Sequence, residues 1–150
     1  MKLRAYQSGD CPVLIRLFRE TVHAVCAGDY APEQLAAWAP EDIAQSDWDR
    51  SLLLHTTLVA EEGGQIIGFG DLDPATGYLD RLYVHRNHQR QGVAAALCGA
   101  LEPLAPGRVF TYASRTARPF FERRGYRVIR ARQVERRGVS LDNYEMEKLL

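Results

Sequence analysis

The sequence predicts a single α/β or α+β domain built on a mixed β-sheet. The chain has 150 residues and 46% hydrophobic content, which is enough to bury one core without disulfides or a metal. β-type runs and helical periodicities alternate in the order strand, two or three helices, three strands, helix, strand, helix and two strands. No repeat or linker divides these elements, so we expect residues 1–150 to form one domain.

The chain opens with a strand and an amphipathic helix. Residues 2–6 alternate as in a short strand, and Ser8 or Asp10 is expected to cap the helix that follows. That helix carries apolar residues at helical spacing over 14–25, and Gly28 is expected to end it.

Two short helices and a hairpin come next. Pro32 and Pro40 are each at the start of a helical pattern, over residues 32–38 and about 40–53. The β-type runs 56–62 and 65–72 are joined by Gly63-Gly64, a two-residue turn that accepts positive φ and so predicts a hairpin.

The second half alternates between strands and helices. Residues 73–77 have turn chemistry, and 78–84 resume the extended pattern, so three consecutive antiparallel strands are expected. Helical spacing and turn residues then predict a helix at 92–102, a strand at 109–113, a helix at 116–124 that stops at Gly125, and strands at 126–134 and 144–149.

The zero net charge hides a division along the chain. Residues 20–80 hold 12 acidic residues against Arg50, whereas residues 81–137 hold 13 arginines against three glutamates and contain no lysine. Arginine favours bidentate contacts with phosphate, so the second half suits a phosphorylated ligand and the first half a cationic one. The alternative is a pair of solvated faces that neutralise each other across the fold.

Several classes of protein are excluded by composition. No run approaches the roughly 20 apolar residues of a membrane-spanning helix, and no apolar signal core follows Met1. Three cysteines form an odd, widely spaced set without a CxxC motif, which indicates reduced thiols rather than disulfides or a zinc site. We therefore expect a cytoplasmic protein.

The most informative segment joins a strand to a helix through a polar, basic loop over residues 84–92. The first N–H groups of a helix have no backbone partners, and the helix dipole favours an anion there, so this is a candidate phosphate site. Gly92 allows close approach to a ligand, and Ala94 and Ala95 are small. The loop adds further donors from Gln89, Arg90 and Gln91.

This segment resembles the GNAT superfamily of acyl-CoA-dependent N-acyltransferases. Gln89, Gly92 and Ala94 fill the family's Q/R-x-x-G-x-G/A signature, and residues 117–126 are similar to its A-x-x-F-Y-x-x-x-G-F/Y segment. The resemblance covers nearly the whole chain. It implies a GNAT-like mixed, mostly antiparallel central sheet flanked by helices, with acetyl-CoA as co-substrate and no metal.

The resemblance also implies which residues hold acetyl-CoA. Backbone N–H groups from Gln91 through Gly92, Val93 and Ala94 to Ala95 would cradle the pyrophosphate, bordered by Gln89 and Arg90. The preceding strand would pair with the pantetheine arm through Leu82, Tyr83 and Val84, with the Leu82 N–H as the oxyanion donor to the acetyl carbonyl. Ser114 and Phe121 occupy positions that border the coenzyme in relatives.

Acyl transfer to an amine needs a base, because an alkyl amine is protonated at neutral pH. Tyr78 lies where some relatives carry glutamate, and Asp80 shares its strand face, so Asp80 is the candidate base. Asp71 and Asp73 are weaker alternatives, and a salt bridge to an arginine is the structural alternative for Asp80. The loop histidines His85 and His88 lack further nearby ligands, so no metal site is predicted.

The departing thiolate needs a proton, and relatives usually supply it from the tyrosine of the F-Y pair. This sequence has Phe121 there, which cannot donate. Either water protonates the thiolate or another hydroxyl does, with Tyr78, Tyr83, Tyr112 and Ser114 as candidates.

The family frames its acceptor pocket with the first two helices and the central strands. That places His23, Tyr30, Trp38 and Tyr144 as candidate acceptor-binding residues, with packing as the alternative role for the aromatic ones. The surplus carboxylates would favour a cationic acceptor, and a small-molecule amine is the expected substrate.

Three functions follow from these features. The first is an acetyl-CoA-dependent N-acetyltransferase acting on a small amine, a peptide N-terminus or a protein lysine, as a monomer or homodimer. The second is a non-catalytic acyl-CoA-binding or regulatory module, motivated by Phe121 and the missing glutamate. The third is a nucleic-acid-binding domain that uses the 13 arginines, which is disfavoured because the acidic segment repels a polyanion.

Overall fold

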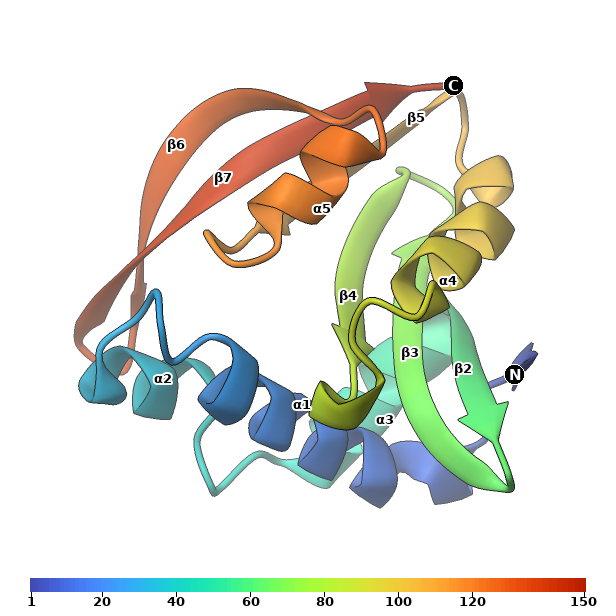
Figure 1. The fold of residues 1–150 in the computed structure, drawn as a ribbon, viewed down its shortest axis with the longest axis horizontal. Coiled ribbons are helices and arrows are strands. Elements are labelled where there is room, and N and C mark those ends of the chain that lie inside the picture. The colour runs from blue at the N-terminus through green and yellow to red at the C-terminus, as the bar shows by residue number, and fades with distance from the viewer.

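A seven-stranded mixed sheet organises the protein, whose computed structural model describes residues 1–150 (Figure 1). The strand order is β1-β2-β3-β4-β5-β7-β6, and every neighbouring pair is antiparallel except the parallel pair β4 and β5. This confirms the predicted mixed, mostly antiparallel sheet. The strands are β1 (Lys2–Ala5), β2 (Thr56–Glu62), β3 (Gln65–Asp73), β4 (Tyr78–Val84), β5 (Arg108–Ala113), β6 (Arg127–Arg136) and β7 (Val139–Leu149).

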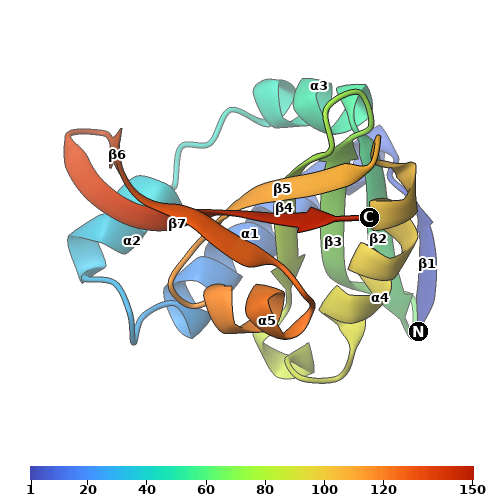
Figure 2. The ribbon, with the colours of Figure 1, turned by 90° about the horizontal axis from the view of Figure 1, so that it is seen from above.

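Helices cover both faces of the sheet. The helices α1 (Cys11–Val25), α2 (Pro32–Trp38) and α3 (Gln45–Leu54) share one core with Val59 and Phe69 of the sheet. The helices α4 (Val93–Leu101) and α5 (Arg118–Arg123) pack against the other face. Seen from above, the hairpin of β6 and β7 extends past the other strands of the sheet and contacts α2 (Figure 2). None of the helices has the length and hydropathy required of a membrane span.

The helix α1 forms as its apolar spacing predicts, but its ends differ from expectation. Asp10 does not cap the helix, because its carboxylate accepts hydrogen bonds from Arg4 and from the Gln7 N–H at 2.9 Å. Ser8 also fails as a cap, since its hydroxyl donates to Asp49. The helix ends at Val25, before Gly28.

The predicted starts of two other elements were wrong because contacts between distant residues determine them. The third helix begins at Gln45 instead of residue 40, because Asp42 pairs with Arg137 at 2.7 Å and Ile43 packs against the core. The last strand begins at Val139 instead of residue 144. A tight turn with positive φ at Arg137 and Gly138 returns the chain, and the polar residues that follow pair along β6.

The strands β4 and β5 diverge almost where they meet. Their ladder contains one residue pair, Tyr78↔Phe110, and the Phe110 N–H donates to the Gly77 oxygen at 3.0 Å. The Thr111 hydroxyl donates to the Leu79 oxygen at 2.8 Å next to this point. Beyond it the facing edges of the two strands have no ladder between them, so the sheet opens in its middle (Figure 1).

A β-bulge lies in β4 beside this opening. The register with β3 passes from Arg81↔Asp71 to Leu79↔Leu72, so Asp80 is the additional residue. A bulge redirects side chains and often lies next to an active site. Here it turns both Asp80 and Arg81 towards the same cavity.

Candidate active site

A cavity of about 340 Å³ lies beside the opening between β4 and β5. Its walls come from the first three helices and from the facing strands, and they are rich in aromatic side chains. The residues that line it are Phe18, Tyr30, Trp38, Trp48, Tyr78, Asp80, Arg81, Tyr83, Tyr112, Ser114, Arg132, Val134, Arg136, Leu141, Asp142 and Asn143.

Asp80 and Tyr78 lie together in this cavity, as their spacing predicts. The Tyr78 hydroxyl donates to Asp80 Oδ1 at 3.2 Å, and the Asp80 side chain is 25% exposed. Burial raises the pKa of Tyr78 above its ordinary value, and the neighbouring Asp80 carboxylate raises it further. Tyr78 therefore remains a neutral donor that orients the Asp80 carboxylate.

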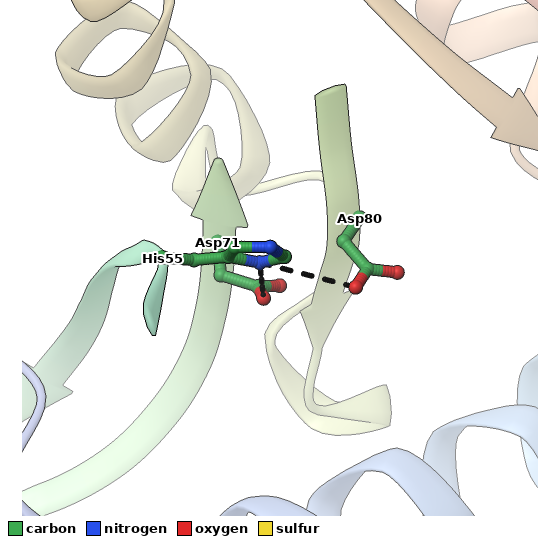
Figure 3. A group of neighbouring side chains, drawn as sticks. All are labelled: His55, Asp71 and Asp80. Atoms are coloured by element: carbon green, nitrogen blue, oxygen red, sulfur yellow. Dashed lines mark hydrogen bonds and ion pairs between the residues drawn. The ribbon is translucent and has the colours of Figure 1, made fainter. Parts of the chain in front are cut away.

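A buried ionic cluster stands behind Asp80 (Figure 3). Asp71 is fully buried, and its Oδ2 lies 2.8 Å from His55 Nδ1 and 2.5 Å from Arg81 Nη1. The same two groups lie 3.9 Å and 3.4 Å from Asp80 Oδ2. Arg81 is fixed further by Ser51 and by the face of Trp48, whose ring centroid lies 4.7 Å from its Cζ. Asp80 is thus salt-bridged and also accessible from the cavity.

The cluster shifts the protonation of its members. The hydrogen bond to Asp71 raises the pKa of His55, although burial acts in the opposite direction. Burial raises the pKa of the Asp71 carboxyl, and the contacts with His55 and Arg81 partly offset this. His55 is therefore more easily protonated than an exposed histidine.

The donor atoms of His55, Asp71 and Asp80 lie within 4.8 Å of one another, a composition that a divalent cation could use. However, the Arg81 guanidinium already contacts both carboxylates. Each loop histidine lies beside one carboxylate, with His85 Nε2 3.7 Å from Glu20 and His88 Nδ1 3.6 Å from Glu62.

The peptide groups of β4 alternate between its two edges. The His85 N–H donates to the Ile67 oxygen at 2.8 Å, and the antiparallel register continues through Tyr83↔Phe69. In such a ladder the intervening residues point their N–H and C=O groups away from the partner strand. The peptide groups of Leu82 and Val84 therefore face the open side, towards β5.

The loop between β4 and α4 is held by backbone geometry. Arg90 and Gly92 both have positive φ, at 60° and 81°, and Gly92 is the residue before the helix. The Gln89 side chain donates to the Val84 oxygen at 2.6 Å, which ties the loop to the strand. Val93 is buried, so only its backbone is available to a ligand. Gln91 and Ala95 are exposed beside it.

The sequence and the fold of the chain match a known family. The family model described as acetyltransferase (GNAT) domain matches residues 26–148. This chain belongs to the GNAT acetyltransferase family. Over 148 residues it is 35% identical to the uncharacterized N-acetyltransferase YafP of Escherichia coli, covering 97% of this chain and 94% of that protein.

Solved GNAT structures share the fold. A GCN5-related N-acetyltransferase of Rhodopseudomonas palustris superposes with a TM-score of 0.94 at 32% identity, over 99% of this chain and 95% of that one. The PaiA N-acetyltransferase of Thermoplasma acidophilum, solved with coenzyme A, gives 0.78 at 19% identity over 99% and 98% of the two chains. YncA of Salmonella typhimurium, solved with acetyl-CoA, gives 0.71 at 19% identity over 100% and 94%.

Two of the four predicted acceptor-binding residues of this GNAT domain line the cavity, namely Tyr30 and Trp38. The other two do not. His23 is exposed on α1 and its Nε2 lies 2.9 Å from the Ala39 oxygen, so it caps the end of α2. Tyr144 points to the opposite face of β7, where its ring lies 4.5 Å from the Arg118 guanidinium.

All four candidate hydroxyl groups, on Tyr78, Tyr83, Tyr112 and Ser114, line the cavity. Phe121 does not, because it is buried and packs against Tyr126 with ring centroids 5.0 Å apart. The Ser114 hydroxyl accepts the Ala117 N–H at 3.0 Å at the start of α5.

Sequence reasoning missed five residues around the cavity. They are His55, Trp48, Arg81, Arg132 and Arg136. The alternation of Arg132, Val134 and Arg136 was the one local signal, since it puts them on one strand face. The acidic surplus of residues 20–80 also contributes less than expected, because Asp80 is its one member in the cavity wall.

Proposed function

We propose that this GNAT domain transfers the acetyl group of acetyl-CoA to the primary amine of a small molecule, by direct attack within a ternary complex. One observation carries the proposal: the open peptide edge of β4 meets the cavity at Asp80. A thioester laid along that edge would present its carbonyl carbon to an amine held in the cavity.

The chain offers a continuous binding path for acetyl-CoA. The N–H groups from Gln91 to Ala95 lie at the N-terminus of α4, where the helix dipole favours phosphate. The outward peptide groups of Leu82 and the outward N–H of Val84 are free to pair with the amides of pantetheine, whereas the Val84 oxygen already accepts hydrogen bonds from Gln89 and Thr21. The widening between β4 and β5 would admit that arm without breaking a ladder.

Asp80 is the proposed base of the transfer. The ammonium group first loses a proton to water, and the neutral amine nitrogen then forms a bond to the carbonyl carbon while the Leu82 N–H stabilises the developing oxyanion. The attacking nitrogen becomes strongly acidic as it gains positive charge, so a carboxylate is basic enough to take its proton directly or through one water. The C–S bond then breaks, and the electron pair leaves with the sulfur of coenzyme A.

Protonation of the thiolate needs no tyrosine at the position of Phe121. Thiols are far more acidic than alcohols, and the cysteine thiol has a pKa of about 8.5, so a thiolate is a tolerable leaving group near neutral pH. We propose that water supplies the proton through the opening between β4 and β5. The hydroxyls of Tyr112 and Ser114 line the same space and are the alternative donors.

The size of the cavity favours a small acceptor, since about 340 Å³ lies at the low end of small-molecule sites. Three free, buried cysteines suit a reducing compartment, and we propose the cytoplasm.

Asp80→Asn tests the proposal. We expect kcat to fall by about a hundredfold, because removal of a general base typically costs that much or more. Release of the coenzyme A thiol is measured across a panel of primary amines, and calorimetry with acetyl-CoA should show unchanged affinity. Asp73→Asn is the matched control, since Asp73 lies at the end of β3 outside the cavity and Asn can still accept the Ala75 N–H.

A non-catalytic acyl-CoA-binding role is the second candidate, and the burial of Phe121 at the usual tyrosine position favours it. Binding of acetyl-CoA without thiol release for any amine in the panel would support this role over catalysis.

A further inference from the structure

Two arginines in the cavity wall have no carboxylate partner. The strand β6 carries Arg127 and Arg130, which pair with Glu147 at 2.8 Å and Glu145 at 2.7 Å. Arg132 and Arg136 follow on the same strand and line the cavity, yet neither forms an ion pair. An arginine cannot lose its charge in a protein, so these two cations face the space where the acceptor would bind.

Arg132 is held in place but left unsatisfied. Its Cζ lies 3.9 Å from the centroid of the Tyr112 ring, and its Nη1 is buried without a hydrogen-bond partner. Asn143 is its cross-strand neighbour, and Asn143 Oδ1 is also buried without a partner. Leaving a buried charged donor unpaired is costly, which indicates that a ligand supplies the missing acceptor.

The other charges of the cavity wall are already compensated. Arg81 contacts Asp71 at 2.5 Å, and Asp142 is paired with Arg115 at 2.9 Å. The two β6 arginines are the charges that remain without a carboxylate, and they lie across the cavity from Asp80, which is shared with Arg81 and His55. The rings of Tyr78 and Tyr112, whose centroids lie 5.6 Å apart, separate Asp80 from Arg132.

We propose that the cavity selects small amines that also carry a carboxylate. This inference rests on the proposed function: the amine lies at Asp80, the aromatic walls hold the spacer, and the Arg132 guanidinium binds the carboxylate with Arg136 beside it. Asn143 Oδ1 is itself an acceptor, so it would take a hydrogen bond from a donor and does not bind the carboxylate. The planar guanidinium fork matches a carboxylate in bidentate geometry. A diamine or an amine without a carboxylate would leave Arg132 unpaired and would meet its positive charge.

Matched ligand pairs test this selectivity by binding. The pairs are 4-(aminomethyl)benzoate with benzylamine and 6-aminohexanoate with hexylamine, titrated in the presence of coenzyme A, so that a spacer separates the amine from the carboxylate. Trp38 and Trp48 line the cavity, so their fluorescence reports occupancy without turnover. We expect each amino acid to bind about tenfold or more tightly than its partner without a carboxylate, since hydrogen bonds to charged groups contribute that much.

Arg132→Met should abolish this preference while leaving the affinity for the amines without a carboxylate within about twofold. Arg136→Met should weaken it less, and it serves as a second variant if Arg132→Met does not fold. Arg127→Gln is the matched control on the same strand, because its side chain is 72% exposed and lies outside the cavity.

The outcomes separate this inference from the proposed function. Equal binding of both members of each pair, binding of none, or a preference that survives Arg132→Met would overturn the inference. Carboxylate-dependent binding that Arg132→Met removes would support the inference even if no thiol is released. The lack of thiol release would count only against the proposed acetyl transfer.

Discussion

Asp80 owes its position to one additional residue in β4. Without the bulge, strict alternation would put Asp80 and Arg81 on opposite faces, and the cavity would receive one of them. With it, Asp80 contacts Tyr78, Arg81 and His55. Asp71 anchors the group from below, because it is fully buried and cannot turn to solvent.

The raised pKa of His55 makes a prediction about stability and pH. A histidine whose pKa is higher in the folded state than in the unfolded state stabilises the fold below its unfolded pKa of about 6.5. That stabilisation is lost as the pH rises through the folded pKa. His55→Gln should therefore lower the free energy of unfolding more at about pH 6 than at about pH 9.

Urea unfolding of wild type and variant at both pH values is the measurement. An equal loss at the two values would show that His55 contributes through packing and uncharged hydrogen bonds, and that its proton is not coupled to folding.

At the scale of elements, the junction between β4 and α4 combines a glycine in an unusual backbone conformation with a valine that is fixed in the core. Gly92 has a φ of 81°, and a Cβ built there would meet no atom within 4 Å. The position is therefore open to a ligand but costly for other residues, by about 1–2 kcal/mol. Val93, one residue on, is locked into the core.

Gly92→Glu should weaken acetyl-CoA binding by at least about tenfold, because it puts a negative side chain where the pyrophosphate is proposed to lie. Calorimetry with acetyl-CoA and with coenzyme A measures the change. Gly107→Glu is the matched control, since Gly107 has a φ of 86° and an equally open surrounding but lies in the turn before β5. Equal losses in both variants would attribute the effect to backbone strain.

At the scale of the whole molecule, one buried carboxylate connects three elements. Glu102 follows α4. Its carboxylate accepts hydrogen bonds from Nε and Nη2 of Arg124, both at 2.8 Å, from the Tyr126 hydroxyl at 2.7 Å and from Lys148 of β7 at 3.3 Å. Burial alone would raise the pKa of Glu102, but the hydrogen bonds from Arg124 and Tyr126 outweigh it and lower the pKa.

Glu102→Ala should lower the free energy of unfolding by about 3 kcal/mol, because it leaves the partly buried Arg124 guanidinium and the buried Tyr126 hydroxyl without their partner. Glu122→Ala is the control, since its pair with Arg118 is exposed and contributes about 0.5 kcal/mol or less. Denaturant unfolding near neutral pH measures both. A comparable loss in the two variants would contradict the role of Glu102.

Local signals predicted most of the fold. Gly63-Gly64, both at positive φ, gave the β2–β3 hairpin, and the helix after Gly92 began as its glycine and alanines indicated. The predicted start of the third helix was wrong because Asp42 pairs with Arg137, which is distant in the sequence. No local pattern contains such a contact.

The candidate site also has one part that the sequence predicts and another part that it does not. The proposed phosphate-binding part is one continuous segment, so the sequence alone is enough to propose its residues. The cavity wall depends on the pairing of β6 with β7, whose register shifts between Val128 and Arg130. That register puts Asn143 in the cavity and Tyr144 outside it, and a single sequence does not contain it.

The opening between β4 and β5 also bears on how the two halves of the molecule are coupled. A single ladder pair joins the four-stranded and three-stranded parts of the sheet along that seam. If the amides of acetyl-CoA fill the gap, the co-substrate acts as a missing strand, and its binding energy is added to the cohesion of the fold. Each catalytic cycle would then join and separate the two parts of the sheet, and the free energy of unfolding would rise and fall with the concentration of acetyl-CoA.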